Sequence, residues 1–409
     1  MATYESYKDS GVKWLGQIPS HWEVKKLRAF FSEVCESNSA LKVHNQLQFK
    51  YGTIVPKPNT GVDDAVLKTV SKYTVVNRGD IIINGLNLNY DFISFRVGKV
   101  NEQGVITSAY IAMRPNKGLS SKFYEYLLKA MDAKKVFHGF GTGIRATLSF
   151  KELKHKFLPL VPLNEQEAIV AYLDKVTGDI DRAIEAQQKM IDALNERKQI
   201  IITRAVTRGL NPDAPLRDSG IDWLGQIPEH WSIRKIKYFA RLRSGKNLTS
   251  EQITPDKQEN LFPVFGGNGL RGYYTKYNTD GEFAIIGRQG ALCGNINYAV
   301  GQFWATDHAV VCTPIFDYPL LWFGETLKVA NLNQYATQSA QPGLSVERVK
   351  NVSLPCPPND EMASIAVYIQ KIISDDTPAI NQCERMIFLL QERKQIIINE
   401  VVTGKTKVI

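Results

Sequence analysis

The chain has 409 residues, 44% of them hydrophobic, and a formal net charge of +9, so we expect two or more domains and a surface compatible with a polyanionic partner, although this charge does not require one. Its five cysteines are scattered and form no CxxC pair, which argues against a disulfide framework and a zinc site. The sequence has no apolar N-terminal segment and no apolar run of membrane-spanning length, so a soluble, cytoplasmic protein is expected.

The first zone of the chain, residues 28–157, predicts a mixed α/β domain. It is rich in β-branched and aromatic residues, with Gly and Asn at expected turns. One helix is expected over residues 122–136. The expected strands cover residues 74–76, 80–84, 92–100 and 105–113.

A helical zone follows over residues 162–208. A first short helix is expected to begin near Asn164. Beyond it, apolar residues recur at alternating steps of three and four, which predicts a heptad seam. The seam positions are Ile180, Ala183, Gln187, Met190, Leu194, Arg197 and Ile201.

A second α/β zone covers residues 237–352, and a second helical zone covers residues 358–403. The second helical zone repeats the first at a constant sequence offset, at which Ile365 corresponds to Ile169. Apart from the segments that close them, the two α/β zones match poorly. We therefore expect one architecture that holds two different binding surfaces.

Both helical zones are expected to break at corresponding places. Gly178 interrupts the first zone. Pro378 interrupts the second, directly after Asp376 and Thr377, which is the pattern of capping residues and a helix-start proline.

Two motifs occur twice and are out of phase with the chain ends. Residues 8–27 return as residues 217–236, and residues 195–207 return as residues 391–403. The middle of the chain carries both motifs in succession, whereas each end carries one. Joining the two ends would recreate the central unit, which predicts two similar halves related by a pseudo-twofold axis and termini that lie close together.

The two long helices have the same heptad phase and are expected to pair antiparallel. A seam of about 27 residues spans roughly 40 Å at ~1.5 Å per residue, close to the ~34–36 Å repeat of B-DNA. Such helices could hold two DNA readers about one helical turn apart. An ordinary helix hairpin without a measuring role is the alternative. Inserting one helical turn near Gln187 and Cys383 distinguishes these two interpretations. The spacing between recognised half-sites should lengthen only if the helices set the distance between the two DNA readers.

The sequence shows no catalytic constellation. Residues 404–406 read Gly-Lys-Thr, but the upstream Gly of a phosphate loop is missing, and no Asp/Asn-Pro-Pro-aromatic tetrapeptide of amino-methyltransferases occurs. The two Glu-Arg-Lys triplets contain the Glu-x-Lys pattern that also occurs in nuclease sites. Both lie in expected helices and are interpreted as surface charge. His21 and His230 recur before Trp, which favours a structural role over metal binding. His308 adjoins an expected strand and is predicted to be buried.

Candidate DNA-reading residues gather on polar, glycine-containing loops. Arg and Lys can bond guanine, and Asn and Gln can bond adenine, in bidentate fashion. Each residue taken singly is more simply a turn former or a phosphate contact, so the clustering carries the prediction. The first α/β zone offers Asn84, Asn87, Asn89, Tyr90, Arg96, Lys99 and Arg145. The second offers Lys246, Asn247, Asn268, Arg271, Tyr273, Arg288, Gln289, Asn295, Gln338 and Gln341.

Several motifs resemble those of the specificity subunit of type I restriction–modification systems, in the same repeat order. They are WLGQIPSHW with WLGQIPEHW, PLNEQEAIVAYLD with the weaker copy PPNDEMASIAVYIQ, and the repeated ERKQIII. The resemblance implies an α+β fold in which two α/β target recognition domains are separated by two long helices that form an antiparallel coiled coil, pseudo-twofold symmetric with a circular repeat organisation. The implied segments are residues 1–27, which complete the C-terminal helical repeat; recognition domain 28–161; central helical repeat and linker 162–236; recognition domain 237–357; and C-terminal helical repeat 358–409.

The resemblance also implies a function and partners. In that family each recognition domain reads one half of a bipartite, asymmetric DNA site. The helical regions dock two methyltransferase (modification) subunits, and restriction/translocase subunits join them. The chain is then not an enzyme and holds no cofactor, because S-adenosylmethionine, ATP and Mg belong to the partner subunits. Asp360 and Met362 replace Asn164 and Gln166 in the second copy, so the two docking sites need not be equivalent.

Two other interpretations remain open. The chain could be the recognition subunit of a related system whose partner fuses nuclease and methyltransferase. It could also be a coiled-coil interaction scaffold that does not read DNA. Salt-dependent binding to one bipartite duplex separates the DNA readers from the scaffold, because phosphate contacts give a steep salt dependence.

Overall fold

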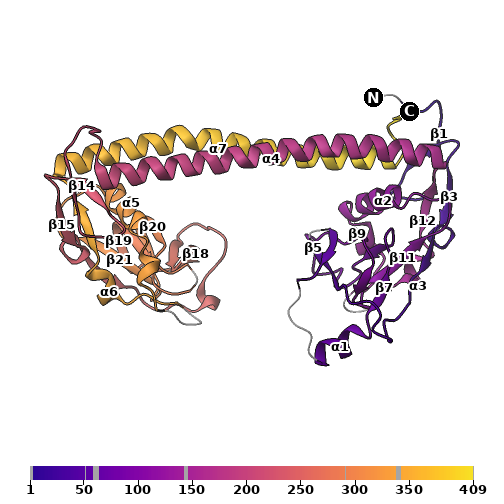
Figure 1. Ribbon diagram of the computed structural model, residues 1–409, viewed down its shortest axis with the longest axis horizontal. Coiled ribbons are helices and arrows are strands. Elements are labelled where there is room, and N and C mark those ends of the chain that lie inside the picture. The colour runs from indigo at the N-terminus through magenta and orange to yellow at the C-terminus, as the bar shows by residue number, and fades with distance from the viewer. Residues whose placement is uncertain are drawn as a thin grey trace. The chain divides into compact units, whose positions relative to one another are not determined.

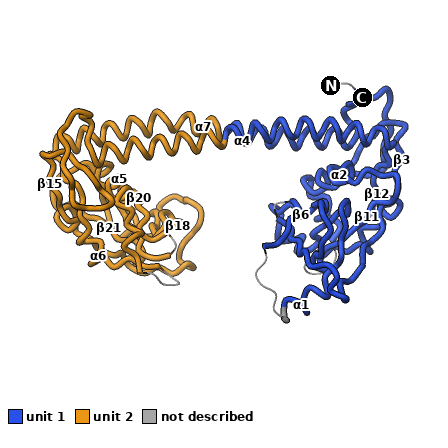
Figure 2. Tube along the Cα trace, in the orientation of Figure 1, with its two compact units in different colours: residues 1–187, 385–409 blue, residues 188–384 orange. Residues whose placement is uncertain are grey.

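The computed structural model describes residues 3–50, 52–58, 64–141, 146–290, 292–337 and 342–408. The chain divides into two compact units, residues 1–187 with 385–409 and residues 188–384 (Figure 2). The two long helices, α4 (Leu163–Arg208) and α7 (Asn359–Val402), each contribute one part to each unit (Figure 1).

The α/β part of the first unit is built on a four-stranded antiparallel sheet. Its order is β4 (Phe31–Glu33), β11 (Ile111–Pro115), β8 (Ile81–Ile83) and β9 (Val97–Lys99). Helix α2 (Ser121–Ala133) packs on this sheet, and its Tyr126 hydroxyl donates to Asp174 of α4 at 2.6 Å. The smaller elements are β5 (Leu47–Lys50) paired with β6 (Thr53–Pro56), β7 (Thr74–Val76) paired with β10 (Gly104–Ile106), α1 (Asp64–Val70), α3 (Phe150–Leu153), η1 (Leu27–Ala29) and η2 (Val136–Gly139).

The α/β part of the second unit carries a different, six-stranded sheet. Its strands are antiparallel except that β17 (Phe262–Gly266) runs parallel to β20 (Ile296–Ala305). Helix α5 (Leu320–Val329) packs against β19 and β20. The sheet order is β16 (Ala240–Ser244), β21 (Ala309–Pro314), β19 (Thr279–Gly287), β20 (Ile296–Ala305), β17 (Phe262–Gly266) and β18 (Gly269–Tyr274). The short helices are α6 (Val346–Lys350), η3 (Ile236–Tyr238), η4 (Ser250–Gln252) and η5 (Leu332–Tyr335).

The repeated segments fold alike in both units and form a common frame. In the first unit β1 (Tyr7–Asp9) pairs with β2 (Gln17–Pro19), and β3 (Glu23–Lys26) pairs with β12 (Phe157–Leu160). The second unit repeats both pairs with β13 (Leu216–Asp218) and β14 (Gln226–Pro228), and with β15 (Ser232–Lys235) and β22 (Ser353–Cys356). The expectation of one architecture with two different surfaces is confirmed.

A glutamate in the first turn of each long helix joins the helix to this frame. In the first unit Glu165 accepts hydrogen bonds from Trp22 Nε1 at 3.0 Å and Tyr4 Oη at 3.1 Å, and contacts His21 Nε2 at 2.5 Å. In the second unit Glu361 accepts from Trp231 Nε1 at 2.8 Å and contacts His230 Nε2 at 2.6 Å. The structural role predicted for the two histidines follows from these contacts.

Both long helices are continuous, so the predicted breaks are wrong. Gly178 lies inside α4, because a glycine costs a helix only about 1 kcal/mol, which packing can offset. Pro378 lies inside α7. Asp376 and Thr377 do not cap a new helix there: the Asp376 carboxylate accepts from Arg197 of α4, and the Thr377 hydroxyl donates to the Ile373 carbonyl at 2.6 Å.

The predicted seam has the right repeat, but part of its phase is wrong. Ile180 is buried and Leu194 half-buried, as predicted, whereas Met190 is 54% exposed and its neighbour Ile191 is 8% exposed. The buried or half-buried stripe of α4 runs through residues 173, 177, 180, 184, 187, 191, 194, 198, 202 and 205. The corresponding positions of α7 are also buried or half-buried, so the internal repeat extends to the packing.

The two long helices run antiparallel. In the first unit Lys394 Nζ lies 2.6 Å from Asp181 Oδ1, and in the second unit Arg197 pairs with Asp376. The partner residue number falls as the α4 number rises, which is the antiparallel sense. Segments near the two ends of the described chain meet within the first unit, where Tyr7 Oη donates to the Lys405 carbonyl at 3.3 Å (Figure 1). Across the described residues, no helix is both long and apolar enough to span a membrane.

Candidate nucleic-acid interface

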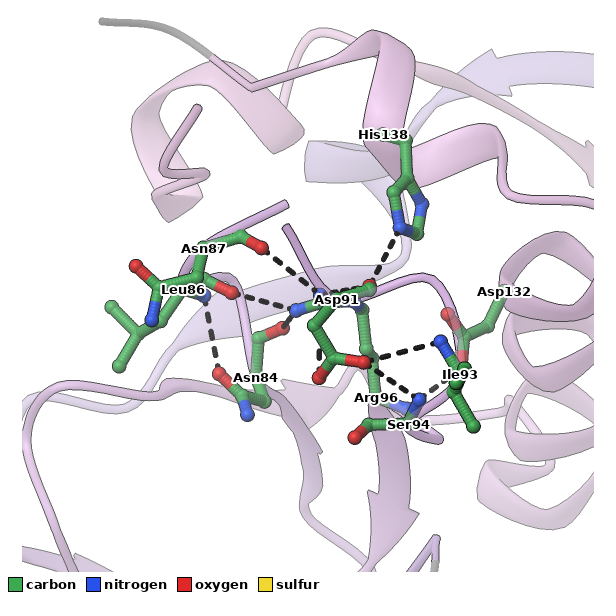
Figure 3. A network of polar contacts seen from close by, with 9 residues as sticks. All are labelled: Asn84, Leu86, Asn87, Asp91, Ile93, Ser94, Arg96, Asp132 and His138. Atoms are coloured by element: carbon green, nitrogen blue, oxygen red, sulfur yellow. Dashed lines mark hydrogen bonds and ion pairs between the residues drawn. The ribbon is translucent and has the colours of Figure 1, made fainter. Parts of the chain in front are cut away.

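The loop between β8 and β9, residues 84–96, is built around a buried arginine (Figure 3). Arg96 is fully buried. Its Nη1 donates to the carbonyls of Asn84 at 3.1 Å and Leu86 at 2.8 Å, and its Nη2 donates to the carbonyls of Asn87 at 3.4 Å and Asp91 at 2.7 Å. The guanidinium thus supplies the polar partners that these loop carbonyls would otherwise need from water.

Asp91 holds the second half of the same loop. Its carboxylate accepts from the backbone N–H groups of Ser94 at 2.9 Å and Ile93 at 3.1 Å. The bonds from Ser94, with smaller contributions from Ile93 and Arg96, lower the pKa of Asp91 to about 2. The carboxylate therefore remains an acceptor over the whole physiological pH range.

Helix α2 and the 3-10 helix η2 after it hold the loop 84–96 through hydrogen bonds and a ring contact. Asp132 of α2 accepts the backbone N–H of Arg96 at 2.7 Å, and burial raises the pKa of this carboxyl group. His138 contacts the Asp91 carbonyl at 3.1 Å through Nε2. Its ring stacks on Phe92 with centroids 4.6 Å apart. The loop is thereby fixed to the core.

This geometry corrects one predicted DNA contact and one predicted strand. Arg96 cannot reach DNA from its buried position and instead shapes the loop. Residues 92–96 are not the start of a strand, because Asp91 captures the backbone N–H groups of Ile93 and Ser94, and the strand there is only Val97–Lys99. The predicted strand over residues 105–113 is likewise two strands, β10 and β11, separated by a turn.

The other predicted residues of the first zone lie around this loop. The Asn84 side chain accepts the Leu86 N–H at 3.1 Å and so serves as a turn former. Asn87 is exposed and adopts a left-handed φ of 53°. Asn89 and Tyr90 are exposed, and Lys99 is half-buried on β9. Arg145 lies outside the described residues.

In the second unit, three predicted readers line one hollow of about 650 Å³. They are Asn268, Arg271 and Gln289, and they share the hollow with His308 and Leu270. Asn295 reaches the same region, because its Nδ2 donates to Asn268 Oδ1 at 3.1 Å. His308 is partly exposed here, so its predicted burial is wrong.

Close backbone packing occurs at Gly267, one of the residues that line this hollow. A Cβ atom on Gly287 would lie 1.8 Å from the Gly267 carbonyl oxygen, so only glycine permits this approach. The Arg288 N–H donates to the His308 carbonyl at 2.9 Å, and the Arg288 carbonyl accepts the Leu344 N–H at 2.8 Å. Three segments far apart in sequence are thus tied together, which holds their side chains at fixed positions.

The remaining predicted residues of the second zone flank the hollow or lie apart from it. Arg288 Nη1 donates to Ser244 Oγ at 3.4 Å, and Tyr273 belongs to β18. Lys246 and Asn247 are exposed in the turn after β16. Gln338 and Gln341 lie outside the described residues.

Sequence reasoning missed two features of these surfaces. One is His308, which was assigned to the core. The other is a group of exposed apolar residues, Phe92, Ile93 and Phe95, which resembled a strand. An Asp side chain can bond the backbone N–H groups that follow it two residues on, so Asp91 was a turn signal that competed with the strand pattern.

The two units define a class of protein in which one repeated frame carries two different α/β inserts with different surface loops.

Comparison with known proteins identifies the family. The chain belongs to the family described as type I restriction modification DNA specificity domain, whose sequence model matches residues 19–190 and 228–384. The resemblance inferred from the repeated motifs is thereby confirmed, together with the α+β fold of two recognition domains and two long helices. The chain is the non-catalytic specificity subunit of a type I restriction–modification system.

Its relatives match to different extents. The EcoprrI specificity subunit of Escherichia coli is 42% identical over 132 residues, which are 32% of this chain and 33% of that relative. The MjaVIII specificity subunit of Methanocaldococcus jannaschii is 26% identical, over 98% of this chain and 97% of that relative. A solved chain from work on complex assembly and conformational transition of the type I R-M system has the same fold, with a TM-score of 0.66 at 14% identity over 94% of this chain and 98% of that chain.

Proposed function

We propose that residues 28–161 and 237–357 are the two recognition domains and that each reads one half of a bipartite, asymmetric DNA site. The observation that carries this proposal is the combination of a repeated frame with two unlike sheets. Two copies of one reader would recognise a symmetric site, whereas two different readers recognise two different half-sites.

The first reader is the fixed loop 84–96, whose exposed Asn87 offers an amide group to base edges and whose Asn89 is also exposed. The second reader is the hollow of Asn268, Arg271 and Gln289. Amide and guanidinium groups are the side chains that bond adenine and guanine in bidentate fashion. Holding them on tied backbone segments reduces the conformational entropy that binding would otherwise cost.

The two long helices are proposed to dock two methyltransferase (modification) subunits, which restriction/translocase subunits join. Their surface supports this role, because large apolar side chains away from the seam remain exposed. These are Met190, Ile200, Val367, Phe388 and Ile396. We propose further that this cytoplasmic subunit itself holds no cofactor and that S-adenosylmethionine, ATP and Mg act in its partners.

The test is methylation mapping in a host that expresses this chain with its modification subunit. The expected map contains one bipartite motif with a fixed spacer. Binding of the purified complex to that duplex should weaken steeply with salt, because phosphate contacts release counterions. A chain that supports no sequence-specific methylation, and that shows no salt-dependent binding to one bipartite duplex, would be a coiled-coil scaffold. A partner that fuses nuclease and methyltransferase would identify the related system.

The second reader is tested by Arg271→Ala. Loss of one base contact is expected to weaken specific binding by about 1–3 kcal/mol and to relax specificity in one half-site only. Arg348→Ala on α6 removes the same charge from an exposed position outside the hollow and is the matched control. Equal effects of the two changes would remove Arg271 from the reading surface.

A further inference from the structure

Four large apolar side chains project from the loop 84–96 within six residues of sequence. Tyr90 is 73% exposed, Phe92 54%, Ile93 91% and Phe95 60%. We call these four residues the apolar ridge. Large apolar groups kept in water are unfavourable for an isolated domain, so four of them within six residues indicate a binding contact.

The exposure of the ridge is built into the fold and does not result from a loose loop. Arg96 bonds four carbonyls of the loop from within, and Asp91 holds the Ile93 N–H. Phe92 is stacked on His138, and a Cβ atom on Gly52 would lie 2.9 Å from Phe95 Cβ. The ridge is therefore a preformed surface that would lose little conformational entropy on binding.

We propose that the apolar ridge is a wedge that packs against or between the base pairs of the half-site read by residues 28–161 and partly unstacks one base step. This inference rests on the proposed function. Proteins that bind the minor groove open base steps in this way with apolar side chains such as Phe and Ile, and they place Asn side chains against the base edges of the same groove. The ridge has that setting, because Asn87 and Asn89 are exposed on the same loop.

The position of the ridge favours DNA over a protein partner. It lies on the same loop as the amide residue Asn87 of the first reader, and three of its members, Tyr90, Phe92 and Ile93, do not line the hollow that Phe95 shares with residues of α2, α4 and α7. The chain also carries a net charge of +9, which favours a polyanion. The apolar ridge on a basic protein therefore matches the chemistry of DNA, in which apolar stacked bases lie inside a charged phosphate backbone.

The proposed wedge predicts an asymmetric distortion of the DNA. In the described part of residues 237–357, exposed large apolar side chains are spread over separate elements and no two are near neighbours in sequence. They are Tyr238, Leu270, Tyr277, Leu292, Val300 and Ile315. Unstacking is therefore expected in one half-site only.

The test uses the full chain with its modification subunit, and a duplex of the mapped site with 2-aminopurine placed at successive positions of each half other than the adenines that become methylated, because a methyltransferase flips its target base out of the stack. With the wild-type chain, fluorescence is expected to rise at one step of one half-site. Ile93→Ser and Phe92→Ser should abolish this rise and weaken binding roughly five- to fiftyfold. Val300→Ser, an equally polar change at a 66% exposed position of the second unit, is the matched control and should preserve both readouts.

Three results would overturn the proposal. One is a fluorescence rise that persists in Ile93→Ser and in the milder Ile93→Thr with binding unchanged. Another is loss of the modification subunit from the ridge variants in size-exclusion runs without DNA, because that result would make the ridge a protein-docking surface. The third, failure of the wild-type chain to bind any bipartite duplex, would reject the proposed function itself before the variants are compared.

Discussion

Replacing Arg96 by methionine tests whether a buried cation shapes the loop 84–96, the first of the two proposed DNA readers. Methionine has a similar length and fills the same space, but it removes all four guanidinium bonds to the carbonyls of residues 84, 86, 87 and 91. Hydrogen bonds to charged groups contribute about 1.5–3 kcal/mol each. Their sum is reduced because burying the guanidinium itself costs free energy and because water can reach the carbonyls of an opened loop. We therefore expect the loop to open about 3–4 kcal/mol more readily.

Amide hydrogen exchange is the direct assay, because it reports local opening separately from global unfolding. A loss of about 3 kcal/mol should speed exchange in residues 84–96 by roughly two orders of magnitude, with little change in α4. Arg288→Met is the matched control, since Arg288 is partly exposed and its side chain makes one bond, to Ser244, at 3.4 Å. Unchanged exchange in residues 84–96 of the Arg96→Met chain would refute the reasoning.

Two further changes probe the frame and the buried acid. Glu165→Ala should cost about 2–3 kcal/mol of unfolding free energy and Glu361→Ala about 1–2 kcal/mol, because Glu165 is the more buried of the two and also accepts from Tyr4; equal losses in denaturant titrations would contradict this order. Asp132→Asn keeps an oxygen for the Arg96 N–H but removes a carboxylate that burial disfavours. Because the folded pKa is raised, the wild-type charge is destabilising above that pKa and the penalty disappears as pH falls through it. The Tm advantage of Asp132→Asn at pH 7 should therefore shrink towards pH 4, and an advantage independent of pH would count against buried charge as its cause.

The repeats and helix periodicity in the sequence were enough to predict the architecture. Two copies of each motif specified the common frame, and the offset between Ile169 and Ile365 extends to the packed seam. The phase was less secure, because Met190 and Ile191 are adjacent and both apolar. Only the contact with the partner helix decides which of the two is buried, and Ile191 is the one that packs.

The reading surfaces were less predictable, because tertiary partners override local pattern there. The run Phe92–Ile93 has strand propensity, but Asp91 and Arg96 hold it as a turn. Arg96 itself resembled a surface contact, since the sequence does not show that the carbonyls of the preceding loop converge on it. Gly178 and Pro378 resembled helix breaks for a similar reason: packing of the two long helices offsets the local cost of each residue.

The way each recognition domain joins the frame has a consequence for how such subunits diversify. Lys26 lies opposite Phe157 in one strand pair, and Lys235 lies opposite Ser353 in the other. The chain thus leaves the frame and returns to it at adjacent backbone positions. The geometry of the frame is therefore the same whatever the topology of the inserted domain. In this one polypeptide a four-stranded sheet is inserted between β3 and β12, and a six-stranded sheet is inserted between the equivalent strands β15 and β22. A new DNA specificity could therefore be acquired by exchanging one cassette, with no compensating change in the other half of the chain.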